Sequence, residues 1–312
     1  MPHRHRGPGG ASVAPRFSFP GLRAALVAIL LGLPASASAD GADEAQIRRG
    51  ESVFHAADCY ACHTDIDNRG PTLAGGRPLK TPFGTFYAPN ITPDPDFGIG
   101  GWSDADFIRA LREGVSPDGV NYYPAFPYTS FTNMTDQDML DLKAYIFSLP
   151  AVSAPSRPHE LPFYLRWRFL VTGWKILNFE KGPLKPDPSK DAKWNRGRYL
   201  VEALAHCGEC HTPRTITGGL VRAETLSGNP VGADLKPVPN ITPDDSGIGA
   251  WSESDIAFAL KSGITPDADT LGAAMADVVE HGTSYLTDED RAAIARYLKS
   301  VPPIRRVLRK AD

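Results

Sequence analysis

Two short stretches of the same form stand 148 positions apart, Cys59-Tyr60-Ala61-Cys62-His63 and Cys207-Gly208-Glu209-Cys210-His211. Each reads Cys-x-x-Cys-His, the attachment pattern of c-type haem. Two thiols three positions apart can each form a thioether with one vinyl group of the same porphyrin. The histidine that follows can then ligate the iron. The first motif (59–63) and the second motif (207–211) use all four cysteines of the chain. They predict two covalently attached haem c groups, with His63 and His211 as axial ligands.

Two other uses of Cys-x-x-Cys have to be weighed, a redox dithiol and half of a zinc site. A dithiol does not require histidine at the next position, and here histidine follows both pairs. A four-cysteine zinc site would have to bring together ligands from opposite halves of the chain. Haem attachment is therefore the favoured interpretation.

The N-terminal segment 1–39 has the form of a secretory signal peptide. Its start is basic, and the apolar run Ala24–Leu33 is too short to span a bilayer. Ala37-Ser38-Ala39 is a small-residue cleavage site, which predicts a mature chain that begins at Asp40. An uncleaved N-terminal anchor is the alternative. Export to the periplasm fits the motifs, since bacteria attach c-type haem on the outer side of the cytoplasmic membrane.

The composition is that of a globular protein, with 42% hydrophobic and 22% charged residues among 312, enough for two small domains. The formal net charge is −3, and removal of the four arginines of segment 1–39 leaves −7. A chain this acidic is a poor binder of nucleic acid. The acidity suits a basic docking partner, or solubility alone. After residue 39 no stretch is long and apolar enough for a transmembrane helix.

The rest of the chain repeats itself with nearly the same offset as the motifs. The matched stretches are Arg49-Gly50 and Arg196-Gly197, Asn90-Ile91-Thr92-Pro93-Asp94 and Asn240-Ile241-Thr242-Pro243-Asp244, Gly98–Ser103 and Gly247–Ser252, and Thr135–Asp138 and Thr287–Asp290. This predicts one domain over 40–150, a linker over 151–190 and a second domain over 191–312.

Each repeat is predicted to be helical. Segments 43–57 and 192–205 have helix-forming composition and lead into the motifs. A serine before acidic residues opens a second helix, a glycine ends it, a threonine caps the last helix and a proline stops it. These residues are Ser103, Gly114, Thr135 and Pro150 in the first repeat and Ser252, Gly263, Thr287 and Pro302 in the second. The Gly-, Pro- and Asn-rich stretches between are predicted to be ordered loops around the haems.

This pattern resembles the class I cytochrome c fold. The resemblance implies an all-α chain of two tandem cytochrome c-like domains with long haem-wrapping loops. In that fold the first and last helices cross with a glycine of one against an aromatic residue of the other. Gly50 with Tyr145, and Gly197 with Tyr297, fit these roles.

The linker 151–190 contains an unusual stretch, 163–179, which mixes aromatic and aliphatic residues with Arg166, Arg168 and Lys175. It is too charged to span a membrane and is predicted to form an amphipathic helix. Packing against the two haem domains is one role for it. The alternative is a docking face for a partner or for the membrane surface.

Methionine is a common sixth ligand of electron-transfer haems, because a thioether favours Fe(II). Met275 lies in a loop-like stretch upstream of the last helix, where class I cytochromes place this ligand. For the first haem Met134, directly before Thr135, is the candidate. Met139 lies inside a helix and suits core packing. His55 is the competitor, although it belongs to the predicted first helix.

Trp102 and Trp251 occupy matched positions. The resemblance implies that their indole N–H groups contact haem propionates, as could the amides of Asn90 and Asn240. Core filling is the alternative for the tryptophans.

Taken together, the motifs resemble the cytochrome c subunits of bacterial periplasmic dehydrogenases of the alcohol, gluconate and aldehyde type. Further shared stretches are Tyr123–Tyr128 and Trp194–Gly197. The resemblance implies a dihaem electron carrier that takes single electrons from a dehydrogenase and passes them to a soluble cytochrome, an oxidase or a quinone. Many members have three haem motifs and a membrane-associating C-terminal segment, whereas this chain has two motifs, and some members have methionine where Phe126 stands here. A soluble acceptor is therefore expected at least as readily as quinone.

The rival interpretation is a haem enzyme with an open sixth site at one iron, of the thiosulfate dehydrogenase or peroxidase type. It follows from the first haem, whose Met134 ligand is less well placed than Met275. A carrier needs no catalytic acid or base, so none is assigned.

Overall fold

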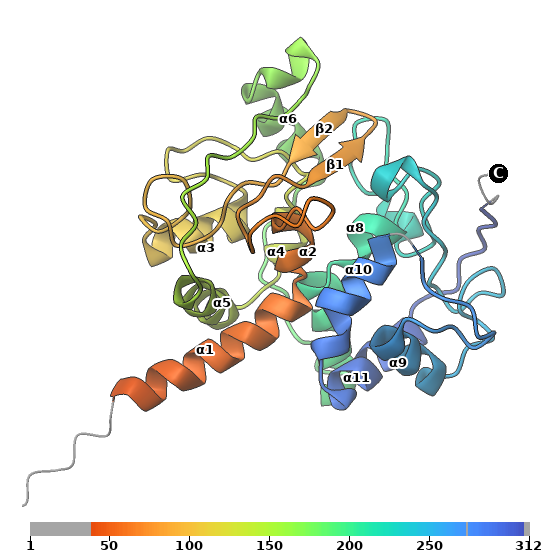
Figure 1. Ribbon diagram of the computed structural model, residues 1–312. Coiled ribbons are helices and arrows are strands. Elements are labelled where there is room, and N and C mark those ends of the chain that lie inside the picture. Colours follow the sequence, from red (N-terminus) through yellow and green to blue (C-terminus); the bar gives the residue numbers. More distant parts are fainter. Residues whose placement is uncertain (1–38, 273, 309–312) are drawn as a thin grey trace, which may run out of the picture. The chain divides into compact units, whose positions relative to one another are not determined.

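A computed structural model describes residues 39–272 and 274–308 (Figure 1). The signal peptide predicted over 1–39 thus falls almost wholly outside the described residues. The first repeat contains α1 (Ala39–Ala56), α2 (Cys59–His63), β1 (Pro78–Thr81), β2 (Gly84–Tyr87), α3 (Asp104–Glu113), α4 (Tyr128–Phe131) and α5 (Asp136–Ser148).

The linker and the second repeat continue the helical pattern. The linker holds the 3-10 turn η1 (Phe163–Arg166) and α6 (Phe169–Asn178). The second repeat holds α7 (Ala192–Tyr199), η2 (Leu200–Leu204), α8 (Cys207–His211), η3 (Arg222–Glu224), η4 (Ala233–Leu235), α9 (Glu253–Ser262), α10 (Ala274–His281), η5 (Thr283–Tyr285) and α11 (Asp288–Leu298). Here η2 is a π-helical continuation of α7, whereas α1 is α-helical throughout.

The predicted helix ends are confirmed by their hydrogen bonds. Ser103 and Ser252 both form capping boxes. The serine hydroxyl accepts a hydrogen bond from the backbone N–H three residues further on, and the carboxylate of that residue accepts one from the backbone N–H of the serine. Gly114 and Gly263 end these helices in the left-handed conformation, which glycine adopts without steric cost. α5 and α11 begin after capping threonines and end before the prolines.

The first and last helices of each repeat cross at the predicted glycines. A Cβ on Gly50 would lie 1.9 Å from the Asp141 carbonyl oxygen and 2.8 Å from Tyr145 Cβ. A Cβ on Gly197 would meet the Ala293 carbonyl and Tyr297 in almost the same way, at 1.9 and 2.9 Å. The backbones are therefore in contact, and only glycine fits.

The repeated order Arg-Gly at these crossings has a second function. Beside Gly50, Arg49 Nε donates to Asp141 Oδ2 at 2.7 Å. Beside Gly197, Arg196 makes two bonds to Asp290, at 2.8 and 2.7 Å. Each arginine thus ties the first helix to an acid of the last one, next to the point where the backbones touch.

The loop after the first motif departs from the prediction of an irregular wrap. Strands β1 and β2 form a two-stranded antiparallel hairpin that pairs Pro78 with Tyr87 and Thr81 with Gly84. The linker adds to it, because Thr85 and Glu160 exchange backbone hydrogen bonds of 3.0 and 2.9 Å. The other regular elements of the described residues are helices. The contact with Glu160 could not be predicted from a local pattern, because it lies 75 positions from Thr85.

The helix predicted over 163–179 is present as η1 and α6, and it contacts both repeats through polar groups. Arg168 Nη1 donates to the Asn121 carbonyl at 2.9 Å, and Trp174 Nε1 to the Thr217 carbonyl at 2.9 Å. Among its apolar side chains, Val171 is buried and Phe179 packs against Tyr128, so the packing interpretation is confirmed for part of the segment. Its other apolar side chains include exposed ones, namely Phe163, Trp167, Phe169, Ile176 and Leu177.

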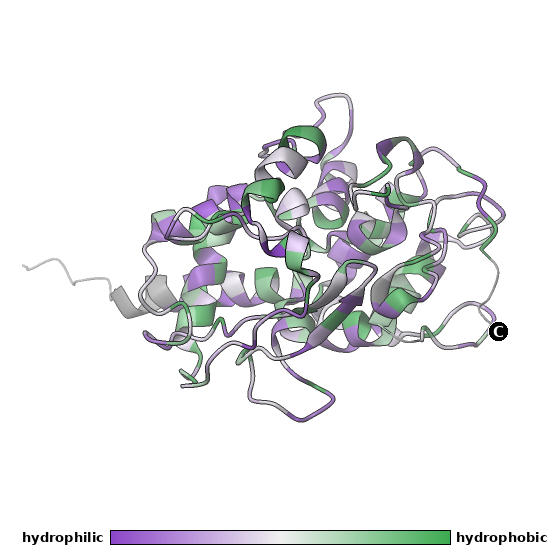
Figure 2. Ribbon diagram, turned by 90° about the horizontal axis from the view of Figure 1, so that it is seen from above, coloured by the Kyte–Doolittle hydropathy of each residue, from purple (hydrophilic) through white to green (hydrophobic). Residues whose placement is uncertain are grey.

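The helices carry hydrophobic and hydrophilic residues side by side along their length (Figure 2). A buried core joins the two repeats, with Phe54, Leu73, Phe131 and Leu142 from the first and Leu204 from the second. Within the described residues, no helix combines the length and apolar character that crossing a bilayer requires.

Candidate haem sites

Each motif forms its own short helix, and the residue before that helix has a left-handed backbone conformation. Asp58 (φ 50°) stands before α2, and His206 (φ 39°) before α8. In α2 and α8 alike, the histidine comes last, and its carbonyl accepts from the N–H of Gly75 or of Gly228, each at 2.7 Å. The two motifs therefore have the same local geometry, as the repeat predicts.

The two motif histidines make the same hydrogen bond to a proline carbonyl. Nδ1 of His63 lies 2.8 Å from the Pro89 oxygen, and Nδ1 of His211 lies 2.8 Å from the Pro239 oxygen. A carbonyl can only accept, so Nδ1 carries the proton and Nε2 presents its lone pair. Burial also lowers the pKa of both imidazoles, which favours the neutral form. This is the donor state that an iron ligand needs.

The two cysteines of each motif stand three positions apart within one short helix, α2 or α8. Among the described residues, no three His, Cys, Asp or Glu side chains gather as a metal-binding group. The zinc alternative thus finds no support there, and the donor set fits haem.

Met134 is fully buried in the core of the first repeat. Its backbone is held by Arg112, whose Nη1 donates to the Met134 carbonyl at 2.7 Å and also to the Thr132 carbonyl. Arg112 is itself buried and pairs with Asp136. No local pattern in the sequence marks this buried guanidinium, since its partners lie 20 to 24 positions away.

Met275 is half-buried, and the expectation that it lies in a loop is wrong. It occupies the first turn of α10, which runs from Ala274 to His281. Four of the eight residues there are Ala, Met or Glu, good helix formers, and the Leu-Gly-Ala stretch before them obscured the helix.

The other candidates for an axial position are engaged elsewhere. Met139 is fully buried inside α5, as core packing predicts. His55 lies in α1, where Nδ1 donates to the His281 carbonyl at 2.8 Å and the ring stacks on Tyr285 at 3.8 Å between centroids. His159 accepts from the Tyr87 N–H at 3.1 Å and packs against Phe86.

The repeated asparagines have a structural task, so the suggestion that they contact propionates is wrong. Asn90 Nδ2 donates to the carbonyls of Val152 and Ala154, and Oδ1 accepts from the N–H and hydroxyl of Thr92. All four hydrogen-bonding positions of that amide are occupied. Asn240 is satisfied likewise, with Nδ2 donating to the Ile304 carbonyl at 2.7 Å.

Trp102 and Trp251 sit half-buried at the edge of the core, each one residue before its capping serine. Neither indole N–H has a partner among the hydrogen bonds of the described residues, whereas Trp174 and Trp194 both have one. The tryptophans therefore remain candidates for propionate contact.

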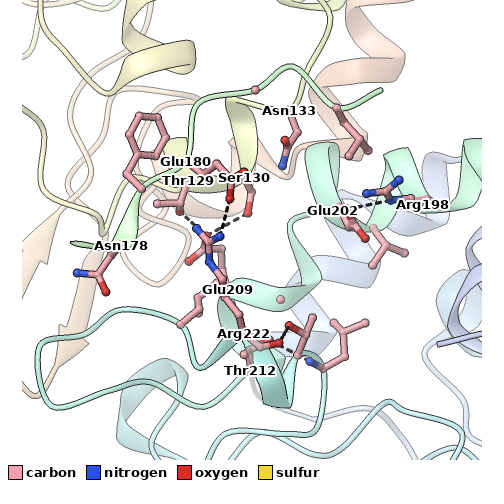
Figure 3. Close-up of a pocket in the computed structure, with 18 of the residues that line it drawn as sticks. Thr129, Ser130, Asn133, Asn178, Glu180, Arg198, Glu202, Glu209, Thr212 and Arg222 are labelled. Atoms are coloured by element: carbon pink, nitrogen blue, oxygen red, sulfur yellow. Dashed lines mark hydrogen bonds and ion pairs between the residues drawn. The ribbon is translucent and has the colours of Figure 1, made fainter. Parts of the chain in front are cut away.

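The two motifs lie close to the seam where the repeats meet. Glu209, inside the second motif, is buried and accepts from Thr129 Oγ1 at 2.5 Å and from Ser130 Oγ at 3.0 Å, both in the first repeat (Figure 3). Arg214 pairs with the same carboxylate at 2.7 Å. Glu209 also lines a cavity of about 550 Å³ that is bounded by the first repeat, the linker and the second repeat. Glu209 occupies a position that the Cys-x-x-Cys-His pattern leaves unspecified, and no local feature of the sequence indicates its distant partners.

Comparison with known proteins places the chain in a family. The cytochrome c family model matches residues 47–150. A diheme c-type cytochrome of Cereibacter sphaeroides is 48% identical over 264 residues, which cover 82% of this chain and 86% of that protein. The chain belongs to the dihaem c-type cytochromes. It accordingly carries two covalently bound haem c groups and functions in electron transfer.

Longer relatives indicate the setting in which such chains occur. The fructose dehydrogenase cytochrome subunit of Gluconobacter japonicus is 42% identical, over 86% of this chain and 55% of that subunit. The cytochrome c subunit of a quinone-type alcohol dehydrogenase from Gluconobacter oxydans is 39% identical, over 89% of this chain and 59% of that subunit. The chain thus spans little more than half the length of these two relatives.

Proposed function

We propose that this protein is the dihaem electron-transfer subunit or partner of a periplasmic dehydrogenase and delivers single electrons to a soluble cytochrome, an oxidase or a quinone. Each haem c supplies one reversible Fe(III)/Fe(II) couple when bound. The observation that carries the proposal is the pair of histidines whose Nδ1–H groups are fixed on proline carbonyls. The relatives named as dehydrogenase subunits support a dehydrogenase as the donor.

The cysteines Cys59, Cys62, Cys207 and Cys210 attach the haems, and His63 and His211 ligate the irons. Met134 and Met275 provide the sixth ligands, and Trp102 and Trp251 donate to propionates. Ligation of the iron by a methionine thioether raises the haem potential and closes the iron to exogenous ligands. Arg112, which donates to the Met134 carbonyl and so fixes the position of this residue, supports this closed, carrier-type role at the first haem over an open enzymatic site.

Each repeat functions as one cytochrome c domain with its own helix crossing, and the two are placed for transfer from haem to haem. The equal contacts at Gly50 and Gly197 support this, because the second repeat reproduces the packing of the part that the family model matches. Glu209, inside the second motif, accepts hydrogen bonds from Thr129 and Ser130 and so ties the attachment helix α8 to α4 of the first repeat.

The linker provides the docking face for the dehydrogenase. We call Phe163, Trp167, Phe169, Ile176 and Leu177 the apolar patch; their exposed fractions run from 53% to 80%. The aromatic rings at its η1 end contact one another, with centroids 6.1 to 6.3 Å apart. Exposed apolar patches rich in aromatic residues mark protein interfaces. A permanent subunit contact of the kind in the named relatives suits such a patch.

Spectroscopy of the two-haem protein tests the proposal. Two low-spin haems with the weak near-infrared band of His/Met ligation are expected, with that band halved in Met134→Leu and in Met275→Leu. A high-spin haem that binds small ligands and turns over peroxide or thiosulfate would instead establish the enzyme interpretation for that repeat.

Docking is tested by the rate at which a reduced dehydrogenase reduces the haems. Trp167→Ser with Phe169→Ser should raise the concentration needed for half-maximal rate while both haem potentials stay unchanged. Ile216→Ser is the matched control, since Ile216 is 96% exposed but lies outside the patch. Equal effects of patch and control variants would rule out the patch as the docking face. For export, N-terminal sequencing of protein from the periplasmic fraction should begin at Asp40.

A further inference from the structure

Helix α10 presents two opposite faces to its surroundings. At 100° per residue, Asp277 and His281 lie on one side of the helix, and Met275 and Val279 lie on the other. Val279 is buried, and its Cγ1 lies 3.9 Å from where a Cβ on Gly263 would stand, at the end of α9 in the second repeat. The face that carries Met275 is thus turned to the second repeat.

The opposite face of α10 is fastened to the first repeat. Arg77 Nη2 lies 2.5 Å from Asp277 Oδ2, and the side chains are only 16% and 31% exposed. The same guanidinium donates through Nη1 to the carbonyl of Ala61 at 2.6 Å. Since Ala61 stands between the two cysteines of the first motif, Arg77 bridges that motif to α10. Figure 1 shows α10 beside α2.

Two further contacts support the same attachment near the end of α10. The His281 carbonyl accepts from His55 Nδ1 at 2.8 Å, and the His281 ring packs on Tyr60 at 4.6 Å between centroids. Gly282 follows, where a Cβ would lie 3.0 Å from the His55 carbonyl oxygen. This end of the helix is therefore held by backbone contact, whereas the Met275 end depends on the ion pair of Asp277.

We propose that Arg77 is a positioning residue for the sixth ligand of the second haem: through Asp277 it holds α10, and with it Met275, from the first repeat. The inference rests on the proposed role of Met275. A partly buried, charge-assisted pair suits this task, because removal of one partner leaves the other charge poorly solvated. The consequence is that a residue of the first repeat controls the ligation of the haem in the second.

The experiment measures the near-infrared His/Met band and both haem potentials in the two-haem protein. The variants are Arg77→Gln, Asp277→Asn and the exchange Arg77→Asp with Asp277→Arg. Met134→Leu and Met275→Leu identify which haem is affected. Arg196→Gln is the matched control, because the Arg196–Asp290 pair also ties two helices of the second repeat but does not touch α10.

Arg77→Gln and Asp277→Asn should lower the band and the potential of the haem identified by Met275→Leu, and speed amide hydrogen exchange in α10. The exchanged pair should restore both, and Arg196→Gln should leave them unchanged. A full band and unchanged potentials in Arg77→Gln, with a halved band in Met275→Leu, would overturn this inference alone. An unaltered band in Met275→Leu would overturn the assignment of Met275, and the inference with it. Haem content per protein, measured in every variant, shows that both groups remain attached.

Discussion

Replacement of Gly50 by alanine should disrupt the first repeat at its closest helix contact. The new Cβ would stand 1.9 Å from the Asp141 carbonyl oxygen, at least 1.1 Å nearer than real Cβ contacts come. The obstacle is the backbone of α5, so no flexible side chain can yield. Overpacking a rigid contact costs about 3 kcal/mol, the upper end of the usual range. For a chain of this size that lowers the melting temperature by roughly 6–12 °C.

The matched control for this change is Gly173→Ala in α6. Gly173 has nothing within 4 Å of its Cβ position. Alanine there should leave the melting temperature unchanged or raise it slightly, because glycine inside a helix costs about 1 kcal/mol relative to alanine. Thermal unfolding of the two-haem proteins, followed by far-ultraviolet circular dichroism, compares the two. If Gly50→Ala melts within 2 °C of Gly173→Ala, as judged against the roughly 6–12 °C expected, the argument from backbone contact is refuted.

Three further predictions concern single buried or half-buried groups. Burial raises the pKa of Asp58 from its ordinary value of 3.8 to about 8 in the folded chain. Between these two pH values the carboxyl is ionised in the unfolded chain but protonated in the folded one, so the folded chain loses stability as pH rises. Asp58→Asn should therefore gain stability relative to the wild type over this interval, with the full gain above pH 8, and parallel urea-unfolding curves for the two proteins would contradict this. Arg112→Leu leaves the Thr132 and Met134 carbonyls without their donor. It should lower the free energy of unfolding in urea by about 2–3 kcal/mol and reduce the His/Met band of the first haem. An intact band would show that Met134 needs no such anchor. Trp102→Phe should shift the potential of the first haem, and an unchanged potential with an unchanged haem spectrum would assign Trp102 to packing.

Short-range patterns in the sequence predicted much of this fold correctly. Helix caps depend on residues three positions apart, so Ser103 and Ser252 could be recognised from their following acids. The crossing glycines Gly50 and Gly197 were equally accessible, because they follow from the resemblance to a known fold. For the haem sites, the sequence predicts roles for the cysteines and histidines, but it contains no signal for the proline carbonyls that orient the rings.

What the sequence did not reveal depends on partners far along the chain. Arg77 and Asp277 are 200 positions apart, and Thr129 and Glu209 are 80 apart. No periodicity connects such residues, since the docking of one repeat on the other decides which polar groups meet. The helical state of Met275 was missed for a local reason: the Leu-Gly-Ala stretch before α10 has the composition of a loop and obscured the good helix formers that follow it.

The amide of Asn90 has a consequence for how the repeat should be divided. Its acceptors, the carbonyls of Val152 and Ala154, lie beyond Pro150, and Ile304 serves Asn240 in the same way beyond Pro302. A fragment that ends with the last helix of a repeat would leave the buried amide N–H groups of Asn90 or Asn240 without these acceptors. The natural unit of duplication therefore extends several residues past each closing helix, and any attempt to express, swap or recombine single repeats should place its joints after 156 and after 306.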